Sequence, residues 1–225
     1  MKGFLFIQLL LLSMLAEAQQ GWNIVYSHIN KEVPAFFPKD SYAWKETYSR
    51  LVLNDSMSFW YGMSEKNDPM KNDPLYGSRI LHHSSLYDLK KQMIFGGAAN
   101  ASSSKRHYYL THPPKTEPWI LEDSVKMILG YPCKKAFLST IQWIRHDTSY
   151  VPVPQLTVAW YTEKIPLPFG PMQYYGLPGL VLEVSDQRYL GRHIRATGIR
   201  EDKISIHIPA GMKIKTAEEL LKNKD

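Results

Sequence analysis

Hydrophobic and polar residues alternate in short segments along most of the chain. In the clearest case, Ile204, Ile206 and Ile208 are separated by the polar residues Ser205 and His207. A period of two places apolar side chains on one face of an extended backbone, which predicts β-strands that are buried on one side. On this pattern and on aromatic and β-branched content, we predict strands at residues 22–29, 48–53, 56–62, 92–95, 106–111, 135–141, 155–162, 180–184, 192–199 and 203–208.

The segments between these strands predict loops and, near the C-terminus, a helix. Residues 62–78 contain two Asn-Asp-Pro turns, and residues 96–105 are small and polar, so both are predicted as loops. Thr216, followed three residues later by Glu219, has the spacing of a capping box at the start of a helix. We therefore expect a mainly β fold: a curved antiparallel sheet, sandwich or partial barrel with a short C-terminal helix.

The first residues of the chain predict export. Lys2 is followed by an apolar run at residues 4–15 and then by Ala16-Glu17-Ala18, which fits the small-residue rule for signal-peptide cleavage. We predict a signal peptide at residues 1–18 and a single domain at residues 19–225, periplasmic or secreted. The net charge of +6 is spread along the chain without a basic block, so nucleic acid is not an expected partner.

Three sequence blocks follow one another closely in the C-terminal half: residues 128–136, residues 157–171 and the pentapeptide at residues 176–180. With these blocks the chain resembles the GLPGLI family of Gram-negative envelope proteins. The resemblance implies an envelope location and a β-rich fold, and it implies no reaction. The motif positions that we take as candidate site residues are Gly130, Tyr131, Cys133, Trp160, Glu163, Pro166, Gly170, Pro171, Gly176, Leu177, Pro178, Gly179, Leu180 and Glu183.

The pentapeptide itself predicts a rigid turn before a strand. Pro178 and Gly179 suit the two central positions of a type II turn, the second of which requires positive φ. We expect this turn to set the register of the strand at residues 180–184.

Cys133 is the only cysteine, so an intrachain disulfide is excluded. One alternative is a reactive thiol, whose pKa the adjacent cations of Lys134 and Lys135 would lower. The favoured interpretation is a small buried residue without a catalytic role.

Glu163 and Glu183 are the carboxylates of the motif region, and a pair of acids can perform acid–base chemistry when one of them is desolvated. We favour a structural role, in which Glu183 is exposed or is paired with Arg192 or Arg195. No Cys, His or Met residues have the spacing of metal ligands, so neither a metal nor another cofactor is expected.

Aromatic residues make up 12% of the chain and gather near the motif blocks. Trp160 and the proline-rich residues 166–171 form either a binding platform or the edge of the core, and we favour the core. The segment between the first two blocks, residues 143–154, carries Arg145, His146 and Asp147 and is a candidate for specific contacts.

These observations predict a non-catalytic binding module for an apolar, peptide or lipid-like ligand or a membrane-protein partner, with contact at the membrane surface left open. One alternative is a periplasmic hydrolase that uses Glu163 and Glu183 or Cys133. The other is a structural assembly subunit. Converging polar groups in a cleft favour the hydrolase, whereas exposed apolar surface favours binding or assembly.

Overall fold

The computed structural model describes residues 19–63, 84–99, 107–114, 118–147, 149–188, 190–208, 214–216 and 219. The predicted signal peptide and the loop expected after residue 63 lie outside these residues. So do the residues of the predicted C-terminal helix apart from Glu219. The predicted capping box is confirmed, because the backbone N–H of Thr216 donates to Glu219 Oε2 (2.9 Å) and that of Glu219 donates to Thr216 Oγ1 (3.2 Å).

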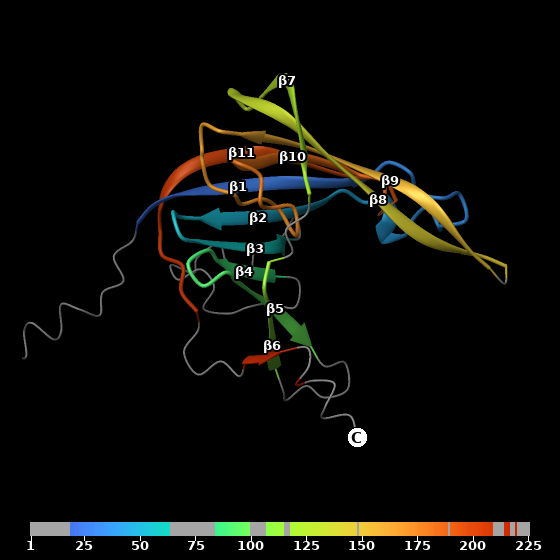
Figure 1. The fold of residues 1–225 in the computed structure, drawn as a ribbon, viewed down its shortest axis with the longest axis horizontal. Coiled ribbons are helices and arrows are strands. Elements are labelled where there is room, and N and C mark those ends of the chain that lie inside the picture. Colours follow the sequence, from blue (N-terminus) through green and yellow to red (C-terminus); the bar gives the residue numbers. More distant parts are fainter. Residues whose placement is uncertain are drawn as a thin grey trace, which may run out of the picture.

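The described residues form one open, curved sheet of twelve strands, in the order β12-β6-β5-β4-β3-β2-β1-β11-β10-β9-β8-β7 (Figure 1). Neighbouring strands are antiparallel, except that β12 runs parallel to β6. The mainly β, antiparallel prediction is confirmed. The strands are β1 (Gln19–Asn30), β2 (Thr47–Leu53), β3 (Met57–Met63), β4 (Ser84–Asp88), β5 (Met93–Ala99), β6 (His107–His112), β7 (Ile120–Ile128), β8 (Tyr131–His146), β9 (Ser149–Thr162), β10 (Leu180–Asp186), β11 (Arg192–Ile204) and β12 (Ile214–Thr216), with a short 3-10 helix η2 (Tyr42–Trp44).

Several predicted boundaries are wrong. The segments predicted at 192–199 and 203–208 belong mainly to one strand, β11, which ends at Ile204. The loop predicted at 96–105 begins instead as strand, because β5 pairs with β6 as far as Ala99. Strands β4, β7 and β12 were not predicted. In β7, the polar residues 122–124 interrupt the alternation where a bulge shifts the register between Glu122 and Val125.

The core lies on both faces of the central strands. Leu51 and Leu53 of β2 are fully buried in the larger cluster, whereas Val52 between them belongs to a second cluster. Because side chains alternate along a strand, the second cluster lies on the opposite face. The larger cluster is covered by the connection between β9 and β10. The apolar side chains that this connection buries most deeply are Ile165, Phe169, Tyr174 and Leu177.

The predicted type II turn in the pentapeptide is wrong. The N–H of Gly179 donates to the carbonyl of Leu177 (2.8 Å), which closes a three-residue γ-turn around Pro178. The positive φ belongs to Gly176, at 87°. Glycine is required at position 179 for space, since a Cβ there would lie 2.2 Å from the carbonyl oxygen of Thr162.

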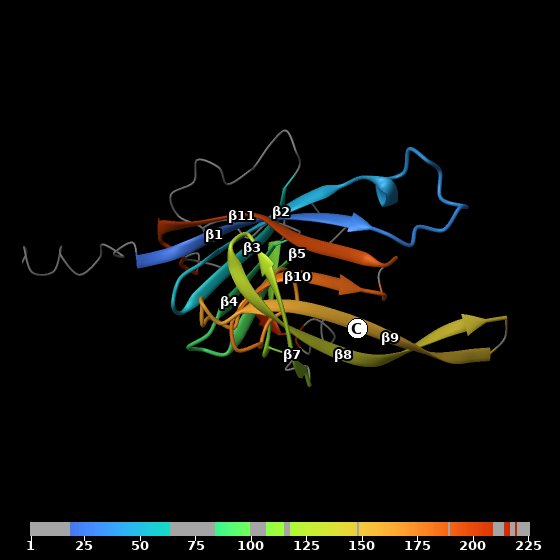
Figure 2. The ribbon, with the colours of Figure 1, turned by 90° about the horizontal axis from the view of Figure 1, so that it is seen from above.

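The hairpin of β8 and β9 extends beyond the rest of the sheet (Figure 2). β7 pairs with β8 only as far as Phe137, and β10 pairs with β9 only from Thr157 onward. Residues 139–155 therefore form a two-stranded ribbon, which we call the arm. Its outer edges have no neighbouring strand in the described part of the chain.

Candidate functional site

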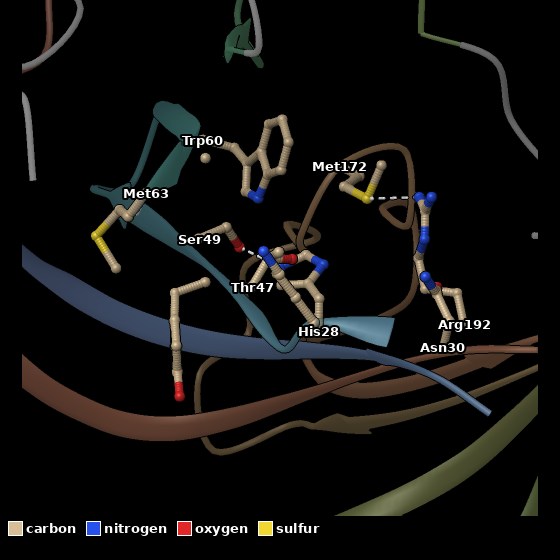
Figure 3. A pocket seen from close by; sticks show the side chains of 11 residues that line it. His28, Asn30, Thr47, Ser49, Trp60, Met63, Met172 and Arg192 are labelled. Atoms are coloured by element: carbon tan, nitrogen blue, oxygen red, sulfur yellow. Dashed lines mark hydrogen bonds between the residues drawn. The ribbon is translucent and has the colours of Figure 1, made fainter. Parts of the chain in front are cut away.

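A cavity of about 420 Å³ opens beside strands β1, β2, β3 and β11, with eleven residues along its wall (Figure 3). β1 contributes His28, β2 contributes Ser49, β3 contributes Trp60 and β11 contributes Arg192. Met172 reaches it from the β9–β10 connection. This volume lies within the range of small-molecule sites in proteins.

His28 and Ser49 are joined at the wall of the cavity. His28 Nε2 lies 2.6 Å from Ser49 Oγ, and Ser49 is 1% exposed. Burial, reinforced by the charge of Arg192, lowers the pKa of His28 to about 4, so its imidazole is neutral near pH 7. A serine beside a neutral histidine resembles a nucleophile and its base. Among the described lining residues, no carboxylate is present that would orient the ring as the third member of such a set does.

The charged residues that line the cavity are cations. They are Arg192 and the exposed Lys45. Arg192 donates from one guanidinium nitrogen to the sulfur of Met172 (3.5 Å). Met172 itself has a φ of 55°, a left-handed conformation that is uncommon for a methionine. Such a backbone at a cavity wall is typical of functional sites, where surrounding packing maintains it.

The indole nitrogen of Trp60 is buried and makes no hydrogen bond within the described part of the chain. In Figure 3 this nitrogen lies on the side of the ring that faces Ser49 and His28. A buried donor without an acceptor is costly, so a ligand or water molecule that accepts from it would stabilise the site.

The predicted motif residues lie elsewhere. Cys133, Trp160 and Glu183 gather around Lys126 of β7, because the curvature of the sheet brings β7 over β9 and β10. The Lys126 ammonium lies 2.6 Å from Glu183 Oε1 and 4.3 Å from the centroid of the Trp160 ring. Arg195 is 3.6 Å from Glu183 Oε2, which confirms one of the two partners expected for that carboxylate.

The alternative in which Lys134 and Lys135 activate Cys133 is not supported. Burial raises the pKa of the Cys133 thiol to about 11, and the cation that partly offsets this effect is Lys126. Lys134 instead pairs with Glu163 (2.8 Å), and Lys135 pairs with Glu122 (2.9 Å). The structural interpretation of Cys133 is therefore favoured.

The remaining motif residues shape the backbone. Leu129 and Gly130 have φ of 49° and 83°, which suits the type I′ turn between β7 and β8. Tyr131 packs edge-on against Trp22, with ring centroids 6.3 Å apart. A Cβ on Gly170 would lie 1.9 Å from the carbonyl oxygen of Tyr174. A further set is buried in or beside the β9–β10 connection: Pro171, Leu177, Gly179 and Leu180, while Pro166, Gly176 and Pro178 are exposed.

The sequence did not predict the residues of the cavity. They come from four strands and one connection, and no local spacing unites them. The only sequence signal is a polar residue on an otherwise buried strand face, such as His28 two residues after the fully buried Tyr26. The described residues contain no group of three His, Cys, Asp or Glu side chains that could hold a metal ion. Among these residues, no helix is sufficiently long and apolar to span a membrane.

Comparisons with known proteins give a fold and a region of sequence similarity. A family model described as "Protein of unknown function (Porph_ging)" matches residues 119–183. Two solved structures are similar in fold: "Structure of PNGF-II in C2 space group" (TM-score 0.59) and "Structure of PNGF-II in P21 space group" (TM-score 0.56). Each is 15% identical and covers 90% of this chain, which spans only 32% of the length of the matched protein. No curated protein matches the sequence.

Proposed function

We propose that the chain is a non-catalytic binding module whose arm docks into an apolar groove of a protein partner. The observation that carries this proposal is the exposure of large apolar side chains on a ribbon that projects from the sheet. Ile141 is 66% exposed, Trp143 62% and Tyr150 64%. Exposed apolar surface gathered on one projecting element is typical of interaction sites.

The arm presents apolar groups on both of its faces. Cross-strand neighbours share a face, so Ile141 lies beside Pro154 and Trp143 beside Pro152 on one side. On the other side Ile144, which is 43% exposed, lies beside Val151, which is 44% exposed. A ribbon that is apolar on both faces fits a groove better than a flat surface. Trp, Tyr and Arg, the residue types that dominate binding hot spots, are present in the arm as Trp143, Tyr150 and Arg145.

A protein groove suits the arm better than the hydrocarbon of a bilayer. Within the described residues, the outer edges of the arm carry backbone N–H and C=O groups that no neighbouring strand satisfies. Each such group would cost several kcal/mol in hydrocarbon. A protein partner can supply hydrogen bonds to these edges. Pro152 and Pro154 limit continuous strand addition along β9, because proline has no N–H to donate.

The proposal includes export to the envelope and membership of the GLPGLI family. Export is supported by Lys2, the apolar run at residues 4–15 and the Ala16-Glu17-Ala18 site. The family assignment is supported by the three sequence blocks, which all fall within the region matched by the family model.

The hydrolase alternative receives less support from the geometry. Glu163 and Glu183 each pair with a lysine, and the Cys133 thiol is buried with a raised pKa. A structural assembly subunit remains the alternative that the arm also fits, with a second copy of the chain as the partner.

Capture from envelope extract by tagged wild type and two variants tests the proposal. The first variant combines Trp143→Ser and Tyr150→Ser, and the matched control is Phe36→Ser, which removes an 80% exposed apolar ring outside the arm. We expect the arm variant alone to lose captured proteins that wild type and control retain. Identical captured proteins for all three would contradict the proposal. If purified wild type sediments as an oligomer that the arm substitutions dissociate, the partner is another copy and the assembly alternative is favoured.

A further inference from the structure

We propose that the cavity between β1, β2, β3 and β11 binds a small organic carboxylate, with its anionic group at Arg192 and its body against Trp60. This inference is independent of the arm. It assigns to the cavity a ligand class that follows from the charges, donors and apolar groups of its wall.

The charge of the wall is positive. Arg192 and Lys45 line the cavity, and no Asp or Glu is among the described lining residues. The nearest carboxylate in the sheet register is Asp186, the cross-strand neighbour of Arg192. Asp186 is already engaged: Arg188 approaches it at 2.7 Å and the Tyr174 hydroxyl donates to it at 2.6 Å. Asp186 is thus bound by groups that do not line the cavity, and the described lining itself carries two cations and no acid.

A carboxylate is the anionic group that best fits the cations of the cavity wall. A guanidinium presents a planar pair of N–H donors that fits the two oxygens of a carboxylate. Among the described residues, the lining holds one arginine and one lysine, fewer cations than a multiply charged phosphate would favour. Met172 is the acceptor of one guanidinium donor of Arg192, and a thioether is a weak acceptor that an anionic oxygen would displace.

The rest of the wall requires an organic body rather than a simple ion. Trp60 offers an apolar ring, and its unpaired buried N–H offers a donor on the side that faces Ser49 and His28 (Figure 3). Met63 and Met172 add flexible apolar contact, which adapts to an irregular shape. The volume of about 420 Å³ accommodates a six-membered ring with a carboxylate substituent.

Two carboxylate probes and their neutral analogues test the proposal. Benzoate has an apolar body and is compared with benzamide; glucuronate has a polyhydroxylated body and is compared with glucose. Binding is measured by calorimetry and by the indole N–H resonance of Trp60, which is assigned with the variant Trp60→Phe. We expect at least one carboxylate to bind and to move this resonance, and its neutral analogue to bind at least tenfold more weakly. The probe that binds identifies the class of body.

Charge variants locate the anionic group. Arg192→Gln should weaken binding of the effective probe about tenfold or more, and Lys45→Gln should weaken it by a few-fold because that side chain is exposed. The control Arg200→Gln, at a 66% exposed arginine of the same strand outside the lining, should leave affinity unchanged. Lys45→Gln keeps the test decisive if Arg192→Gln fails to fold. The proposal is overturned if neither carboxylate binds at millimolar concentration, if the neutral analogues bind equally well, or if a folded Arg192→Gln binds the effective probe as tightly as Arg200→Gln. If Arg192→Gln does not fold, equal affinities of Lys45→Gln and Arg200→Gln overturn it.

Discussion

The same two strands, β8 and β9, pass through two different environments. Within the sheet, Ala136 and Ala159 are cross-strand neighbours and both are fully buried. Farther along the same hairpin, Trp143 and Pro152 are also cross-strand neighbours, yet Trp143 is 62% exposed. Pairing is the same in both regions, and the difference is the presence of β7, β10 and the β9–β10 connection. Strand pairing and burial are therefore separate properties, and the second needs additional elements.

The contrast also separates stability from function. In the sheet, each fully buried Val, Leu, Ile, Phe or Met side chain contributes about 1.5–3 kcal/mol, so the apolar residues there are explained by packing. In the arm, an isolated two-stranded ribbon is marginally stable and its large apolar side chains remain in contact with water. Folding does not explain those side chains, whereas the partner that we propose would cover them.

The largest expected effect lies where the covering connection rejoins the sheet. Gly179→Val should reduce the free energy of unfolding by about 3–4 kcal/mol, because its Cβ would lie 2.2 Å from the Thr162 carbonyl oxygen and the backbone would have to move. Urea unfolding measures this change. The control Gly198→Val, where a Cβ meets no atom within 4 Å, should unfold near the wild-type midpoint. Equal midpoints for both variants would show that the connection is not closely packed on β9.

The sequence predicted the strands of the sheet better than the contacts between distant residues. Strands were predicted at residues 135–141 and 155–162, but their pairing continues to His146 and Ser149. This extension was missed because the arm is apolar on both faces and therefore lacks a period of two. Strand β7 was missed because its bulge interrupts the period of two. The type II turn predicted at Gly179 was wrong. Glycine is needed there because of close contact with Thr162, seventeen positions earlier in the chain, and turn rules consider only neighbouring residues. The cavity was not predicted, because the sheet order alone brings β1, β3 and β11 together.

Lowering the pH should reduce the stability of the protein, because His28 becomes protonated more easily when the chain unfolds. Its pKa is about 4 in the folded protein and 6.5 in the unfolded chain, so between these values the unfolded state binds more protons. The free energy of unfolding should therefore fall by about 2 kcal/mol as the pH is lowered from 6.5 to 4, after allowing for the partly exposed ring. Ser49 contacts the ring, the charge of Arg192 acts on it, and Lys45 lines the same cavity.

Denaturant titrations across this pH range measure the effect, and His28→Gln provides the comparison. The variant should show a shallower decline with acid. It should keep part of the slope, because burial also lowers the pKa of His193. An unchanged slope in His28→Gln would show that His28 is protonated equally easily in both states.

The smallest effect on stability is expected in the arm, and it provides the sharpest test of the contrast between the two regions. Ile141→Ala should change the free energy of unfolding by less than about 0.5 kcal/mol, because the side chain is 66% exposed and leaves no cavity. Leu138→Ala, three residues earlier on the same strand and 2% exposed, should cost about 2–4 kcal/mol. Urea unfolding of the two variants under identical conditions compares them directly. A loss of 2 kcal/mol or more for Ile141→Ala, similar to that for Leu138→Ala, would show that the arm is covered by the chain itself. Its apolar side chains would then belong to the core rather than to a partner surface.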